Sequence, residues 1–130
     1  MAAPHAVVCL PFTSEVRPLY DLLDLVLLPS HSEGLSQSLL EAMALGKPVI
    51  ASAASGNLDL VTDGVDGRLV PPLVPMAWAA TIEQLLADAG DAHRLGNAAR
   101  HTARERFGLE RTVTRTAELY RSLLRSDPRP

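Results

Sequence analysis

An uninterrupted apolar run at residues 25–28, Leu-Val-Leu-Leu, most constrains how this chain can fold, because it stops abruptly at Pro29. A strand without polar alternation is buried on both faces, which is typical of a parallel sheet that helices cover on each side. Sequence of helical character stands on either side of this run. We therefore expect an α/β chain in which strands and helices alternate.

The rest of the chain fits this alternation. Three further strands are predicted at residues 7–10, 48–51 and 68–70, which gives a doubly wound parallel sheet of about four strands. Helices are predicted at residues 16–23, 39–45 and 58–62, and three C-terminal helices begin at Pro75, after Asp91 and at Leu109. Residues 1–125 are predicted to form one partial domain, and residues 126–130 a disordered tail.

Two details of the C-terminal helices follow from their side chains. Asp91 is predicted to be the N-cap of the middle helix, which runs to about residue 106. In the last helix, over residues 109–125, the apolar side chains share one face, and these are Val113, Ala117, Tyr120 and Leu124.

Charge is unevenly distributed. The net charge of −3 argues against a general nucleic-acid binder, yet nine of the twelve Lys and Arg residues follow residue 90. Solvated faces of the last two helices explain this bias most simply. A peripheral contact with anionic lipid head groups, or with an acidic partner, is the alternative.

The single cysteine, Cys9, lies in an apolar run, which excludes an intramolecular disulfide and indicates a buried thiol in a reducing, cytoplasmic compartment. The longest uncharged apolar stretch, residues 69–80, is too short for a membrane span and contains three prolines. The N-terminus lacks the pattern of a signal peptide. No cluster of metal-ligand residues stands out in the sequence.

Residues 29–48 join a strand to a helix through a turn of small residues, and two carboxylates, Glu33 and Glu41, flank this turn. In open parallel sheets, ligands bind outside the carboxyl ends of the strands. Residues 29–38 and 52–57 both leave strands at that edge, so we expect them to converge there.

Three motifs together resemble the donor-binding domain of retaining glycosyltransferases of the GT-B architecture, the group 1 family related to sucrose synthase and mannosyltransferases. They are Pro-Ser-x-x-Glu-Gly at residues 29–34, Glu-Ala-Met-Ala-x-Gly-Lys-Pro-Val at 41–49, and Asp-Gly-x-x-Gly-x-Leu-Val-Pro-Pro at 63–72. The resemblance continues through residues 95–100 and ends near residues 120–124.

The resemblance implies a nucleotide diphosphate sugar as donor substrate, with neither a metal nor a cofactor. Glu33 would bind hydroxyls of the donor sugar and stabilise the transition state electrostatically, as the catalytic residue. Glu41 would hold the ribose hydroxyls of the nucleotide. An ionised carboxylate suits both roles because it accepts two hydroxyl donors.

The resemblance also implies contacts through backbone amides. Those of Gly34, Leu35 and Ser36 would approach the sugar and diphosphate, and those of Ser38 and Leu39 would face the diphosphate. A helix N-terminus favours such an anion because its first amides lack helical partners.

A structural alternative competes for Glu41. Ser38-Leu39-Leu40-Glu41 is a capping-box pattern, in which Glu41 would reach back to the amide of Ser38 and only stabilise the helix start.

Full-length members of the family carry an Arg and a Lys that neutralise the donor diphosphate, and an N-terminal domain that binds the acceptor. Neither is found in these 130 residues. We therefore expect a fragment of a transferase, inactive alone, that supplies part of a donor site. A non-catalytic nucleotide-sugar binding module and an interaction domain that acts through its C-terminal helices are the alternatives.

Overall fold

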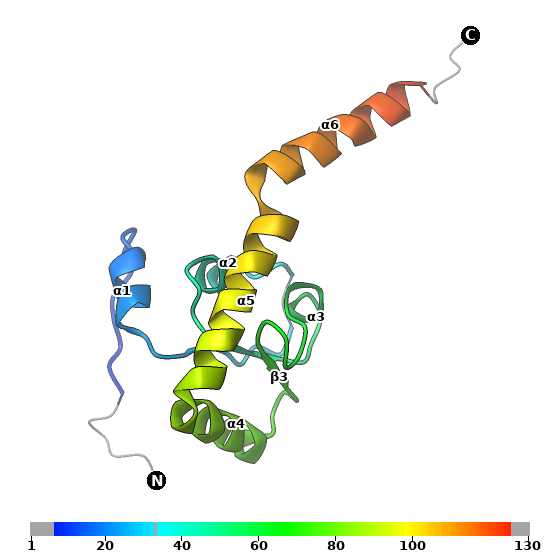
Figure 1. The fold of residues 1–130 in the computed structure, drawn as a ribbon. Coiled ribbons are helices and arrows are strands. Elements are labelled where there is room, and N and C mark those ends of the chain that lie inside the picture. Colours follow the sequence, from blue (N-terminus) through cyan, green and yellow to red (C-terminus); the bar gives the residue numbers. More distant parts are fainter. Residues whose placement is uncertain (1–6, 33, 126–130) are drawn as a thin grey trace.

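The computed structural model describes residues 7–32 and 34–125. Helices and strands alternate up to residue 70, and the described residues from 75 to 125 then form successive helices (Figure 1). The elements are α1 (Arg17–Leu22), β1 (Val26–Leu28), α2 (Gln37–Ala44), β2 (Val49–Ser52), α3 (Asn57–Leu60), β3 (Arg68–Val70), α4 (Pro75–Ala87), α5 (Ala89–Phe107) and α6 (Leu109–Arg125).

The three strands form one parallel sheet in the order β1-β2-β3. Val26 of β1 pairs with Val49 of β2, and Ile50 of β2 pairs with Arg68 of β3. Because the strands are parallel and consecutive, their carboxyl ends lie at one edge of the sheet, where the loops after β1 and β2 begin.

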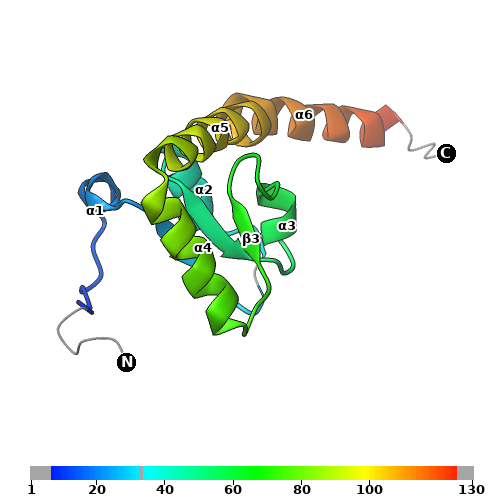
Figure 2. The ribbon, with the colours of Figure 1, turned by 60° about the horizontal axis from the view of Figure 1, so that its bottom comes forward.

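Helices cover both faces of the central strand. Every residue of β2 is buried, and successive residues point to opposite faces. Val49 and Ala51 pack in a cluster with α2 and α5, whereas Ile50 packs with Leu85 of α4 and Leu95 of α5. In Figure 2, α4 crosses one face of the sheet. The predicted α/β fold class, with helices on each side of a parallel sheet, is confirmed.

One predicted strand is not formed. Residues 7–10 are irregular and exposed, with Val7 at 72% and Val8 at 78% relative exposure. A strand needs a neighbour to pair its backbone, and the described residues offer none beside this run. The sheet therefore has three described strands instead of about four. The same placement leaves Cys9 exposed, so the prediction of a buried thiol is wrong.

Side-chain caps fix where α2 and α5 begin. Ser36 is the N-cap of α2, and Asp88, rather than the predicted Asp91, caps α5 by accepting a hydrogen bond of 3.0 Å from the Asp91 amide. After α2, Gly46 takes a φ of +74°, a conformation that glycine adopts without the steric cost of a Cβ.

The last helix runs away from the sheet (Figure 1). Its bounds match the prediction, but none of its residues is buried. Among the described residues, no helix is long and apolar enough to cross a membrane. The tail predicted at residues 126–130 lies outside the described part.

Candidate functional site

Side-chain hydrogen bonds hold the carboxyl ends of β1 and β2 together. The hydroxyl of Ser52 donates to the Leu28 carbonyl at 3.3 Å, and Asn57 Nδ2 donates to the Ser52 carbonyl at 3.1 Å. Both Ser52 and Asn57 are fully buried. The two loops that leave these strands therefore start side by side, as the topology predicts.

Two polar atoms near these strand ends are buried without a hydrogen-bond partner in the described part of the chain. They are Oγ of Ser30, just after β1, and Oδ1 of Asn57, at the start of α3. Buried polar atoms are normally paired, and exceptions often mark a place for water or a ligand. The carboxyl edge of the sheet thus has unused hydrogen-bonding capacity.

The turn that leads into α2 carries most of the predicted site residues. Gly34 and Leu35 are exposed, whereas Ser36 is 7% exposed and Leu39 fully buried. As the N-cap, Ser36 accepts a hydrogen bond of 3.3 Å from the Leu39 amide. A ligand contact through the Leu39 amide would compete with this internal bond. The amide of Ser38, one residue earlier, belongs to the first turn of the helix, where no preceding helical carbonyl is available.

Glu41 lies exposed on α2 and does not cap the helix. The N-cap is Ser36, and the residue three positions later, where a capping box needs its Glu or Gln, is Leu39. The capping-box interpretation of Glu41 is therefore wrong. Its carboxylate is instead placed next to the hydroxyl of Tyr20, which lies 3.4 Å from Glu41 Oε2.

Tyr20 is a neighbour of Glu41 that the sequence interpretation missed. Its side chain is 9% exposed, and its hydroxyl also donates to the Ser38 carbonyl at 2.9 Å. Burial, and then the charge of Glu41 and the hydrogen bond to it, raise the pKa of Tyr20 above its ordinary 10.0, so the hydroxyl stays protonated as a donor. A buried phenol usually finds a polar partner, and this rule could have directed attention to Tyr20.

Glu33, the predicted catalytic residue, lies outside the described residues. Its neighbour His31 is exposed. Within residues 7–32 and 34–125, no three or more His, Cys, Asp or Glu side chains gather as a metal site would require.

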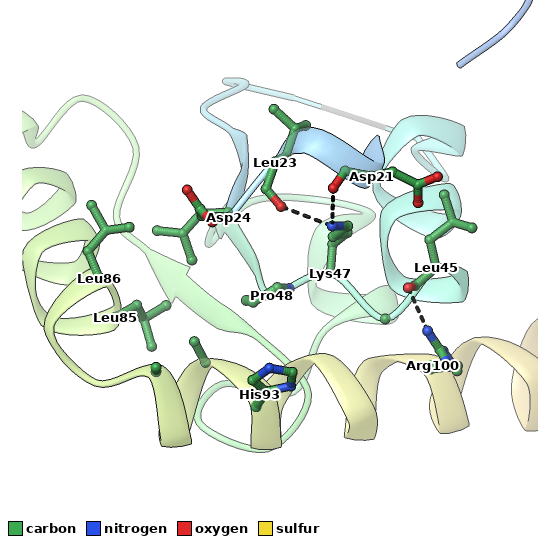
Figure 3. A pocket seen from close by; sticks show the side chains of 14 residues that line it. Asp21, Leu23, Asp24, Leu45, Lys47, Pro48, Leu85, Leu86, His93 and Arg100 are labelled. Atoms are coloured by element: carbon green, nitrogen blue, oxygen red, sulfur yellow. Dashed lines mark hydrogen bonds between the residues drawn. The ribbon is translucent and has the colours of Figure 1, made fainter. Parts of the chain in front are cut away.

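A cavity of about 630 Å³ lies at the opposite edge of the sheet, where the strands begin (Figure 3). Its two cationic side chains hold helix ends. Lys47 Nζ donates to the carbonyls of Asp21 and Leu23 at the end of α1, at 3.3 and 3.0 Å, and Arg100 donates to the Leu45 carbonyl after α2 at 2.8 Å. The charge of Lys47 therefore lies at the C-terminus of α1. These hydrogen bonds indicate that the positive charges of Lys47 and Arg100 stabilise the fold.

The sequence matches the model of a family described as "Glycosyl transferases group 1" over residues 3–102, and the chain belongs to this family. The D-inositol 3-phosphate glycosyltransferase of Salinispora tropica is 40% identical over 111 residues, which cover 85% of this chain and 23% of that protein. The chain therefore spans about a quarter of the length of this curated relative.

Solved structures agree. A protein of Anabaena, HepE in complex with UDP, matches with a TM-score of 0.82 and 30% identity, over 85% of this chain and 31% of that one. Sucrose-phosphate synthase of Thermosynechococcus elongatus matches with a TM-score of 0.80 and 34% identity, over 86% of this chain and 28% of that one. The resemblance to GT-B glycosyltransferases is thereby confirmed.

Proposed function

We propose that this chain supplies part of the donor site of a retaining glycosyltransferase that transfers a hexose from a nucleotide diphosphate sugar. The observation that carries the proposal is the state of Glu41, which is exposed in the second turn of α2 and does not cap this helix. An exposed carboxylate there is suited to accept two hydroxyl hydrogen bonds from a ribose.

The turn before Glu41 suits the rest of the donor. The exposed residues Gly34 and Leu35 precede the first turn of α2, whose amides favour an anionic diphosphate because they lie at the positive end of the helix dipole. The HepE structures hold UDP or UDP-glucose, which are ligands of this chemical class. Glu33 remains the proposed ligand of the sugar, through its position in the family motif.

In the proposed reaction, the acceptor hydroxyl attacks the anomeric carbon on the face that the diphosphate leaves, and the anomeric configuration is retained. The leaving phosphate takes the acceptor's proton. Glu33 orients the sugar and stabilises the positive charge that develops on it, and no covalent intermediate is assigned to Glu33. The residues of this chain bind and orient the donor.

The acceptor site and the basic pair that neutralises the diphosphate are proposed to come from outside these 130 residues. The curated relatives are about four times longer, which supports a further N-terminal domain as partner. The isolated chain is expected to bind nucleotide without turning over a nucleotide sugar.

Calorimetric titration of the chain with UDP, GDP and ADP tests the binding claim. Glu41→Ala is expected to weaken binding of the preferred nucleotide about tenfold, since hydrogen bonds to a charged group contribute about 1.5 kcal/mol or more. Glu83→Ala, which removes an exposed carboxylate on α4, is the matched control and should bind like the parent.

Absence of saturable binding at millimolar concentration for all three nucleotides would refute the donor-site proposal. Equal affinity of the Glu41→Ala variant and the parent would refute the role of Glu41. Product formation by the 130 residues alone would show that the site is complete.

A further inference from the structure

We propose that Tyr20 is a positioning residue for the nucleotide site and acts through Glu41. The inference rests on the proposed function, because it takes Glu41 as a ligand of the nucleotide. It is carried by a contact between two separate helices, in which the hydroxyl of the buried residue Tyr20 on α1 meets the carboxylate of the exposed residue Glu41 on α2.

The contact joins the short helix α1 to the first turns of α2. The Tyr20 hydroxyl lies 2.9 Å from the carbonyl oxygen of Ser38 and 3.4 Å from Glu41 Oε2. The hydroxyl of a phenol has a single proton, which the two acceptors therefore share. The hydrogen bond to the carbonyl oxygen is the shorter of the two. Ser38 and Glu41 are three residues apart and lie on one face of the helix, so a single donor serves both.

Such a bond prepares Glu41 for binding. A free glutamate on a helix surface samples several rotamers, and ordering it on binding costs conformational entropy. The Tyr20 hydroxyl restrains one carboxylate oxygen, Oε2, and leaves Oε1 for a ligand hydroxyl.

Tyr20 has a structural role as well, which the test must separate from positioning. It is the buried residue of α1 and belongs to the core cluster that includes Leu39 and Met43. The ring supplies this packing, whereas only the hydroxyl reaches Glu41. Tyr20→Phe removes the hydroxyl and keeps the ring.

Titration of the chain with UDP tests the inference. Tyr20→Phe is expected to weaken UDP binding about fivefold, the equivalent of a hydrogen bond of about 1 kcal/mol. The same change at the exposed Tyr120, in Tyr120→Phe, is the matched control and should leave affinity unchanged. In a Glu41→Gln background, Tyr20→Phe should change the affinity by less than about twofold, because the carboxylate it orders is gone.

The outcomes separate this inference from the proposed function. If the parent chain binds no UDP, GDP or ADP, the proposed function fails and the inference fails with it. If the parent binds UDP and Tyr20→Phe binds it equally well, the inference alone is overturned. An equal loss in both backgrounds would also overturn it, since Tyr20 would then act without Glu41.

A second measurement needs neither nucleotide nor the Tyr20→Phe variant. The chain has two tyrosines, so Tyr120→Phe leaves Tyr20 as the only phenol that titrates in ultraviolet absorbance. Adding Glu41→Gln should lower the pKa of Tyr20 part of the way towards 10.0, because the neighbouring negative charge is lost and burial remains. An unchanged titration would mean that the hydroxyl and the carboxylate are not paired, and would overturn the inference.

Discussion

The two longest helices, α5 with 19 residues and α6 with 17, are both amphipathic but differ in what they bury. α5 buries Leu95, Gly96, Ala99 and Ala103, whereas α6 buries nothing. An apolar face shows which side of a helix can be buried, and burial then depends on whether a surface of matching shape is present.

Small residues allow α5 to pack closely against α2 and the turn that follows it. α5 packs against α2, and a Cβ added to Gly96 would overlap the carbonyl oxygen of Gly46 in the turn after α2. Ala99 lies in the same core cluster as Ala42 and Met43 of α2. On α6 the apolar residues are larger and open to solvent, with Leu123 at 57% and Leu124 at 78% exposure. The close approach that α5 makes is therefore confined to the first of the two helices.

A large loss of stability is expected from Gly96→Ala. The added methyl meets backbone atoms of Gly46, which cannot move aside as a flexible side chain would. Overpacking of this kind should lower the free energy of unfolding by about 3 kcal/mol, measured by urea denaturation. Gly90→Ala, in the first turn of the same helix, is the control, since its Cβ would approach only a side-chain atom of Asp88. Similar small effects at both positions would argue against the close packing of α5.

A smaller loss is expected from Thr102→Val on α5. The Thr102 hydroxyl donates to Oδ2 of Asp66 at 2.7 Å, and Asp66 is 3% exposed. Valine has nearly the same shape but leaves that buried oxygen unpaired, so unfolding should become easier by about 1–3 kcal/mol. Thr112→Val on α6 removes an exposed bond to the Gly108 carbonyl and should change stability by less than about 0.5 kcal/mol. Equal losses in the two helices would contradict the comparison.

The smallest effect is expected from Leu123→Ala on α6. The side chain is more than half exposed, so its removal should change the free energy of unfolding by less than about 0.5 kcal/mol. Leu95→Ala, the same change at a fully buried position on α5, should cost about 2–5 kcal/mol in the same urea experiment. A large loss at Leu123 would reveal that α6 is packed against something in solution.

Much of the fold could be predicted because local sequence signals, namely apolar runs and turn residues, agree with the helices and strands of the structure. The apolar run at residues 25–28 and the small residues after it located β1 and the turn into α2, and the last helix has its predicted bounds, Leu109–Arg125. The strand at residues 7–10 could not be predicted correctly, because whether an apolar run becomes a strand depends on a neighbour that its own sequence does not encode. The thiol of Cys9 was misplaced for the same reason.

The candidate site was predicted from its sequence motif, but the contact through which Tyr20 holds Glu41 was not predicted. Glu41 was located by sequence, but two interpretations remained open because Ser38-Leu39-Leu40-Glu41 also fits a capping box. The hydrogen bond from the Leu39 amide to Ser36 Oγ makes Ser36 the N-cap and removes the capping-box interpretation. Tyr20 was missed since its contact with Glu41 spans 21 positions and depends on how α1 docks.

The position of β1 at the end of the sheet has a consequence for the chain at high concentration. Among the described strands, β1 pairs only with β2, and its middle residue, Leu27, is 43% exposed. A strand edge that is apolar and unpaired is a template for a strand from another molecule, which natural proteins usually protect with charge or with a covering segment. Slow aggregation of the purified chain would therefore be expected to begin at β1.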